Sequence, residues 1–163
     1  MELLEHLEWR YATKKFDPQK KVSREDLNKL KKAIQLSVSS YGLQLYKVLI
    51  IEDIELRKKL KPVSWDQNQI TDASHLFVFC NYNRVNSKDI DTFIRQTADS
   101  RNIEYEKLAG YGDFIKMKLD EKSEVERTNW LERQPYLALS NLLMVCAELG
   151  IDACPMEGFE PER

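Results

Sequence analysis

Residues 136–149, YLALSNLLMVCAEL, carry apolar side chains around nearly the whole circumference of a helix, and this segment constrains the fold most. A helix that is apolar on every face has to be buried on every face. A chain of 163 residues is expected to form one small domain, which offers too little structure to surround such a helix. The sequence therefore predicts that a second copy of the chain covers part of it, in a homodimer.

The same helix is predicted to begin well before this segment. Residues 123–126, SEVE, form a capping box in which the Ser123 hydroxyl and the Glu126 carboxylate pair with free backbone amides. The helical pattern then runs to Leu149 with Pro135 in its interior. Proline removes a backbone hydrogen bond and clashes with the preceding turn, so we expect a kink or a break at Pro135.

The rest of the chain mixes helical and strand patterns. We expect helices at residues 2–9, 23–37 and 53–60, the last ending before Pro62, and strands at residues 46–52 and 75–81. The second strand, HLFVFCN, lacks polar alternation, which predicts burial on both faces. Residues 86–119 are charged and mostly helical, with interruptions expected at Gly110 and Gly112, and suit a lid or excursion. These patterns predict one α+β domain over residues 1–163.

Composition excludes several classes of function. The net charge is −2 and the sequence pI is about 5.8, without the basic stripe that nucleic-acid binding needs. The first residues, MELLEHLEWR, are acidic where a signal peptide is basic, and no apolar run reaches the length of a membrane span. We expect a cytoplasmic protein that binds neither nucleic acid nor membrane.

Cysteine and histidine are too sparse for metal or triad chemistry. Cys80, Cys146 and Cys154 are widely spaced in apolar sequence, which predicts buried reduced thiols. His6 and His75 lack metal-ligand spacing, so no metal site is expected. No glycine-rich phosphate loop and no nucleophile elbow is present. A bound cofactor is therefore expected to supply the chemistry.

Four polar clusters lie at junctions between the expected elements, where binding residues commonly occur. They are residues 10–14, 37–40, 66–72 and 155–158. Arg10 and Lys14 are suited to a phosphate and a second anionic centre, although a solvated basic loop explains them equally. Ser39 and Ser40 could bind a ligand or could be ordinary turn residues.

Taken in order, four motifs resemble the FMN-dependent nitroreductase family, in its oxygen-insensitive NAD(P)H-using branch. They are RYATKKF, SVSS, ITDASHLFVFC and AELGIDACPMEGF, and the resemblance extends from Met1 to Phe159. It implies a nitroreductase-like α+β fold with a central, mostly antiparallel sheet flanked by helices. It also implies an intertwined homodimer with FMN at the subunit interface. Hydride from NADH or NADPH would then reduce a small nitroaromatic or quinone acceptor by ping-pong two-electron transfer.

The resemblance assigns roles to residues of the first and last motifs. Arg10 would bind the FMN phosphate and Lys14 would lie beside N1 and the C2 carbonyl of the ring, with the backbone of Tyr11 and Ala12 along the flavin. The stretch Pro155, Met156, Glu157 and Gly158 would line the cofactor, with the amide of Glu157 or Gly158 near N5. Lys14, Glu157 and Gly158 are thus the expected catalytic residues, because they stabilise the reduced ring.

The two middle motifs complete the expected cofactor site. Ser39 and Ser40 would reach FMN from the partner subunit. Asp66 and Gln69 occupy positions that read the pyrimidine edge, but an acid there opposes an anionic reduced ring, so Gln67 or Gln69 would replace Asp66. His75 is expected to be structural. The aromatic residues of the excursion either border the substrate channel or form a small core of their own.

The family pattern continues beyond this sequence with a last strand, a basic pair for the phosphate and a C-terminal arm. Without them, we expect weakened FMN binding. Two hypotheses follow, a working flavoenzyme and a non-catalytic dimeric relative with little or no flavin. The residues identify neither the natural acceptor nor the preferred nicotinamide nucleotide.

Overall fold

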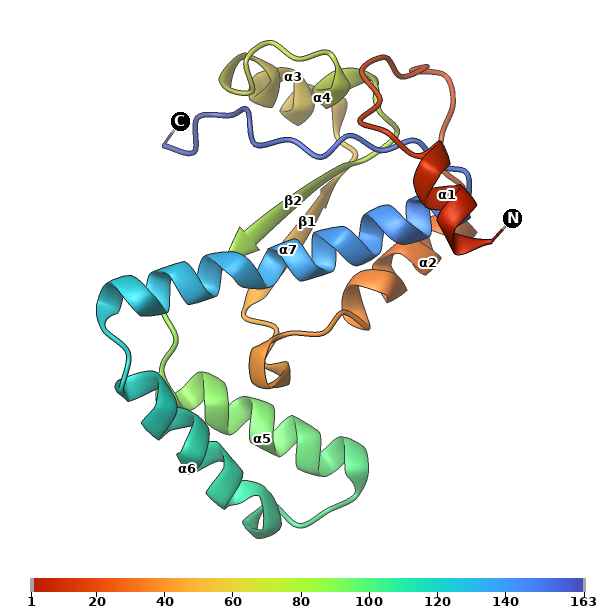
Figure 1. Ribbon diagram of the computed structural model, residues 1–163. Coiled ribbons are helices and arrows are strands. Elements are labelled where there is room, and N and C mark those ends of the chain that lie inside the picture. The colour runs from red at the N-terminus through yellow and green to blue at the C-terminus, as the bar shows by residue number, and fades with distance from the viewer. Residues whose placement is uncertain (1, 163) are drawn as a thin grey trace. The chain divides into compact units, whose positions relative to one another are not determined.

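The computed structural model describes residues 2–162. The helices are α1 (Leu3–Trp9), α2 (Arg24–Gln35), α3 (Ile54–Val63), α4 (Gln69–Asp72), α5 (Ser87–Arg101), α6 (Glu106–Asp120) and α7 (Glu124–Glu148), and the strands are β1 (Tyr46–Ile51) and β2 (Leu76–Asn81) (Figure 1). A short 3-10 helix, η1, spans Ser40–Gly42. The combination of helices with a small sheet confirms the α+β class.

The chain divides into two compact units. Among the described residues, the first unit comprises 2–37, 48–79 and 138–162, and the second comprises 38–47 and 80–137. The last part of α7 therefore belongs to the first unit, and its start belongs to the second. The expected lid, residues 86–119, falls within the second unit and is helical as predicted.

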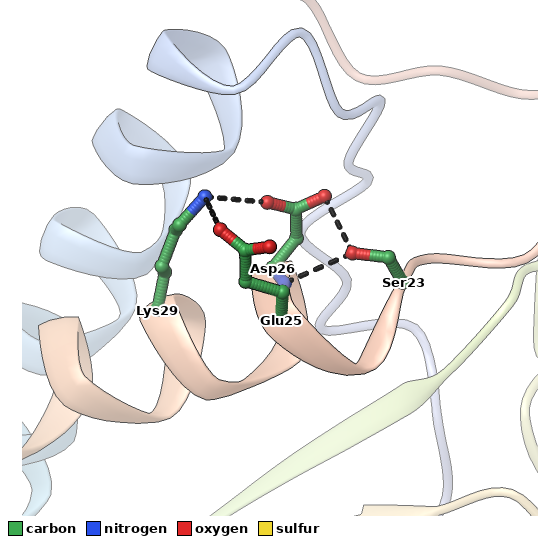
Figure 2. A network of polar contacts seen from close by, with 4 residues as sticks. All are labelled: Ser23, Glu25, Asp26 and Lys29. Carbon is green, nitrogen blue, oxygen red and sulfur yellow. Dashed lines mark hydrogen bonds and ion pairs between the residues drawn. The ribbon is translucent and has the colours of Figure 1, made fainter.

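Helix α2 begins at the predicted cap. The Ser23 hydroxyl accepts a hydrogen bond from the Asp26 amide at 3.0 Å and donates to the Asp26 carboxylate at 2.8 Å (Figure 2). Lys29 Nζ lies 3.0 Å from both the Glu25 and the Asp26 carboxylates. The hydrogen bond from Ser23 lowers the pKa of Asp26 most, and the hydrogen bond from Lys29 lowers it further. One face of this capped helix is buried through Leu27, Leu30 and Ile34.

The sheet consists of β1 paired with β2 (Figure 1). The Tyr82 amide donates to the Leu45 carbonyl at 3.0 Å, one residue beyond the strands, which makes the pair antiparallel. Both strands match their predicted positions. Residues 76–80 are only half-buried, so the expected burial of both faces of β2 is wrong for the single chain.

The core of the second unit lies between α5, α6 and the start of α7. Its buried side chains are Leu43, Leu45, Ile90, Ile94, Ile115, Leu119 and Leu131. Gly112 of α6 lies against α5, because a Cβ atom built there would be 3.0 Å from the Ile94 side chain. The expected interruptions at Gly110 and Gly112 are wrong: α6 is continuous, and the missing Cβ of Gly112 allows close contact between the two helices.

Both prolines expected to end or break a helix are accommodated. Pro62 lies in the last turn of α3, which ends one residue later at Val63, so the lost hydrogen bond affects only the helix terminus. Helix α7 continues without a break through Pro135. The Gln134 side-chain amide donates to the Trp130 carbonyl at 2.9 Å and adds a bond to the turn that Pro135 weakens.

The end of α7 is buried on one face in the single chain. Ala138, Leu142 and Cys146 are buried, whereas Leu137 is 43% exposed. The chain alone therefore does not provide the all-round burial expected of residues 136–149. Burial by a partner stays a prediction.

Candidate functional site

Helix α7 ends in a glycine cap that directs the following residues away from the helix. Gly150 has a φ of +63°, its amide donates to the Ala147 carbonyl at 3.1 Å, and the Ile151 amide donates to the Cys146 carbonyl at 2.8 Å. This bond pair is the Schellman motif, in which the left-handed residue is usually glycine. The motif confirms the predicted cap at Gly150.

The first and last polar clusters lie together in the first unit. Ala12 and Ala153 form a parallel β-bridge, and the Thr13 amide donates to the Ala153 carbonyl at 3.2 Å. The Thr13 hydroxyl donates to the Asp152 carboxylate at 2.8 Å, and Thr13 is only 4% exposed. These contacts hold the backbone just before Lys14 against residues 152 and 153, which precede the segment 155–158.

Two polar side chains from distant parts of the chain converge at Cys154. Lys14 Nζ lies 3.7 Å and Gln69 Nε2 lies 3.9 Å from the Cys154 sulfur. Lys14 is exposed, and the other two residues are half-buried. A cation and an amide donor therefore lie close together next to Pro155, where solvent can reach them. Two such donors can bind the edge of a ring that carries carbonyl and nitrogen acceptors.

The segment around Gly158 packs on the loop between α3 and α4. Gln67 Nε2 donates to the Gly158 carbonyl at 3.2 Å, and the Glu160 amide donates to the Val63 carbonyl at 2.8 Å. A Cβ atom on Gly158 would lie 2.7 Å from the Trp65 ring. Glycine at this position therefore lets the backbone lie against the Trp65 ring, which would have to move if position 158 carried a Cβ atom.

The loop that carries Asp66 has an unusual backbone. Trp65 and Asp66 both have a φ of +53°, in the left-handed region that few residues other than glycine adopt. Both side chains are exposed. The candidates for the pyrimidine edge of the flavin are Asp66, Gln67 and Gln69. Gln69 contacts the same sulfur atom as Lys14, that of Cys154, whereas Gln67 donates to the Gly158 carbonyl.

The other predicted residues of the first unit are arranged as follows. Arg10 is half-buried at the end of α1, where its amide donates to the His6 carbonyl at 3.1 Å. Tyr11 is 65% exposed. Pro155 and Met156 are half-buried, and Glu157 is exposed.

Ser39 and Ser40 belong to the second unit and initiate η1 there. The Ser40 amide donates to the Gln134 side-chain oxygen at 2.8 Å, and the Ser39 hydroxyl accepts from the Gln44 amide at 2.9 Å. Tyr41 and Gly42 follow with φ values of +56° and +78°. The structure thus assigns the two serines local roles in shaping a tight turn, and their approach to FMN stays a prediction.

Sequence reasoning overlooked Arg57, which fixes the loop between α4 and β2. Its side chain is 2% exposed and donates to the carbonyls of Ile70 at 2.6 Å, Ser74 at 3.2 Å and Ala73. Burial lowers the pKa of Arg57, and the nearby charge of Asp72 opposes the shift. Arg57 stood in an ordinary charged helix, RKKLK, so no local signal distinguished it.

His75 is held by structural contacts. Its Nδ1 lies 2.9 Å from the Ser74 hydroxyl, and its Nε2 lies 3.6 Å from the Glu52 carboxylate. Burial lowers the pKa of His75, and Glu52 partly opposes this. These contacts agree with the structural role that the sequence suggested.

The cysteines differ in burial. Cys146 is buried as expected, and burial raises the pKa of its thiol to about 11. Cys80 and Cys154 are half-buried, so the expectation of full burial is wrong for them. Cys154 lies at a surface loop that carries the candidate site, which explains its partial exposure.

Residues 2–162 contain neither a metal-binding cluster nor a membrane-spanning helix. No group of three or more histidine, cysteine, aspartate or glutamate residues is placed to hold a metal ion in this part of the chain. Among the described helices, none has the length and apolar character needed to cross a membrane.

Known proteins resemble the chain over almost its full length. A family model described as the nitroreductase family matches residues 7–163. The major NAD(P)H-flavin oxidoreductase of Aliivibrio fischeri is 36% identical over 166 residues, which cover 98% of this chain and 76% of that protein.

Solved structures share the fold. A nitroreductase-like protein of Streptococcus mutans matches with a TM-score of 0.85 at 22% identity, covering 96% of this chain and 75% of that one. A protein of Exiguobacterium sibiricum, solved in complex with FMN, matches with a TM-score of 0.83 at 19% identity, covering 99% of this chain and 77% of that one. The family model and the 36% identity establish that the chain belongs to the nitroreductase family.

Proposed function

We propose that this chain binds FMN and transfers hydride from NADH or NADPH to small nitroaromatic or quinone acceptors, in a ping-pong reaction. The observation that carries the proposal is the convergence of Lys14 and Gln69 on Cys154, beside the segment that ends at Gly158. Segments far apart in the sequence are brought together there with the donors that a flavin ring edge needs. The names of the relatives support the same reaction class.

The residues fit FMN in their chemistry. When bound, the flavin supplies the hydride acceptor and donor, which the side chains of this site do not provide. Lys14 would hold positive charge beside the ring position where negative charge develops on reduction, and Gln69 would donate to a ring carbonyl. The close packing of Gly158 on Trp65 and its bond from Gln67 would hold this backbone segment in place where the ring is proposed to approach.

Arg10 is the proposed phosphate ligand. A guanidinium group can donate two parallel hydrogen bonds to phosphate oxygens, and Arg10 stands four residues before Lys14, so the two cations can serve opposite ends of one cofactor. The amides of Glu157 and Gly158 are proposed to donate toward N5 of the ring. Tyr11, Ala12, Pro155 and Met156 would contribute backbone and apolar contacts along it.

We further propose a homodimer in which Ser39 and Ser40 of each subunit contact the FMN of the other. Support comes from apolar side chains that one chain leaves exposed on α1 and α7, such as Leu4 at 70% and Leu137 at 43%. Residues 86–119 would act as the lid or excursion beside the acceptor. Tyr105 packs against the core of the second unit, whereas Tyr111 and Phe114 stack with ring centroids 6.5 Å apart and stay exposed.

The test is an FMN titration into flavin-free protein, followed by anaerobic mixing with NADH or NADPH and then with a nitroaromatic or a quinone. We expect quenching of flavin fluorescence, bleaching by a nucleotide and reoxidation by the acceptor. Arg10→Ala should weaken FMN binding by about 1.5–3 kcal/mol, and the exposed Arg24→Ala should not. Protein that binds no FMN, or whose FMN neither nucleotide reduces, would support a non-catalytic member of the family instead.

A further inference from the structure

Cys154 makes three hydrogen-bonding contacts through its sulfur. Its thiol donates to the Pro155 carbonyl at 3.8 Å, and its sulfur accepts from Lys14 Nζ at 3.7 Å and from Gln69 Nε2 at 3.9 Å. A thiol has one proton to donate, and the ammonium and amide groups are donors, so the sulfur is the acceptor in its contacts with the two side chains. One sulfur atom therefore links a cation and an amide that come from different segments of the chain.

The backbone that carries this sulfur is itself fixed. Ala153, the preceding residue, forms the bridge to Ala12 and accepts from the Thr13 amide at 3.2 Å. Lys14 and Cys154 therefore extend from two paired segments, and their separation is set by the backbone pairing. Lysine has many rotamers, and an exposed lysine without such an acceptor would sample most of them.

We propose that Cys154 is a positioning residue that holds Lys14 and Gln69 in the orientation in which they meet the flavin edge. The proposal rests on the FMN site described above and extends it to a residue that does not itself react. The sulfur restricts both side chains before the cofactor arrives, so less conformational freedom is lost on binding. Serine at this position would keep an acceptor that Lys14 and Gln69 can reach by small side-chain rotations, since a C–O bond is shorter than a C–S bond, whereas alanine would remove the acceptor.

The matched variants are Cys154→Ala and Cys154→Ser, with Cys80→Ala as a control for the loss of a half-buried thiol elsewhere. In FMN titrations, we expect Cys154→Ala to raise the dissociation constant about three- to tenfold, as the loss of a modest hydrogen bond implies. Cys154→Ser and Cys80→Ala should stay within about twofold of the wild type. In a Lys14→Met/Gln69→Leu background, Cys154→Ala should have no further effect, because the groups it positions are gone.

A second measurement uses the protein without flavin. The side-chain amide resonances of Gln69 in a 15N-labelled sample should move in Cys154→Ala and stay near their wild-type positions in Cys154→Ser. Wild-type FMN affinity in Cys154→Ala, an equal loss in the Lys14→Met/Gln69→Leu background, or unmoved Gln69 resonances would each overturn the proposal. If the wild type binds no FMN, the proposed function fails, and the Gln69 resonances alone decide whether Cys154 orients its neighbours.

Discussion

Replacing Gly158 with alanine tests the packing that shapes the C-terminal end of the site. The added Cβ would lie 2.7 Å and 2.9 Å from two atoms of the Trp65 ring and 3.0 Å from Gln67 Nε2. These distances are too short for carbon and nitrogen atoms in contact, so Trp65 and Gln67 both have to move. Gln67 has to shift by a few tenths of an ångström, which weakens its 3.2 Å hydrogen bond to the Gly158 carbonyl.

The cost has two parts. The weakened hydrogen bond contributes at most the roughly 0.5–1.5 kcal/mol that a whole bond is worth. Trp65 is 67% exposed and can rotate outward, so the loss of its packing adds less than a core clash would. We expect Gly158→Ala to lower the free energy of unfolding by about 1–2 kcal/mol in total, toward the low end of overpacking effects. Urea denaturation followed by circular dichroism measures this difference.

A double mutant isolates the cause. In a Trp65→Ala background, the ring that blocks the new Cβ is absent, so Gly158→Ala should cost about 1 kcal/mol less than it does alone. Equal losses in both backgrounds, or wild-type stability for the single mutant, would refute the packing argument. The same variants should also weaken FMN binding, because the backbone at position 158 shifts.

Three other predictions concern stability and assembly. Gly110→Ala should stabilise the protein by about 0.5–1 kcal/mol, because alanine favours helices and no atom lies within contact distance of the new Cβ. Gly112→Ala should destabilise the protein, because its Cβ would lie 3.0 Å from the buried Ile94 side chain. Urea denaturation of both variants measures these changes. The pKa of His75 is lowered in the folded protein, so the unfolded state binds the proton more readily and stability should fall as the pH drops through about 6.5. This fall should be smaller in His75→Gln, and thermal melts of both proteins between pH 5 and 8 measure the dependence of stability on pH. Leu137→Glu should shift sedimentation from dimer toward monomer, and a wild-type monomer at micromolar concentration would contradict the proposed assembly.

Local sequence signals predicted the starts and ends of several elements. Ser23 and Ser123 supply caps in the structure, and Gly150 ends α7, because each of these features depends on residues within one helical turn. The burial of β2 was overestimated, because a run of apolar residues does not reveal whether one chain or two must cover it. Helix α3 extends past Pro62 because the proline lies in its last turn, where the missing hydrogen bond matters little, and no break occurs in α7 at Pro135, where the Gln134 side chain adds a bond to the Trp130 carbonyl.

The candidate site was only partly accessible from sequence. The family resemblance names Lys14, Gln69 and Gly158 as candidates, and their roles toward FMN stay predictions. The contacts of Thr13 with Asp152, of Cys154 with two donors and of Trp65 with Gly158 were not foreseen. Each joins segments that are distant in the chain, and no local pattern of hydrophobicity or charge specifies such a pair.

The central claim is that Lys14 places a positive charge beside the flavin ring, and the reduction potential of bound FMN tests it most directly. Lys14→Met should lower the midpoint potential and weaken FMN binding about ten- to a hundredfold, as expected for a lost charge-assisted hydrogen bond. Lys15 is the exposed neighbour of Lys14, and Lys15→Met is the matched control. This variant should leave the midpoint potential and the FMN affinity near their wild-type values. Equal potentials in FMN-loaded wild type and Lys14→Met, or the same shift in Lys15→Met, would contradict the account.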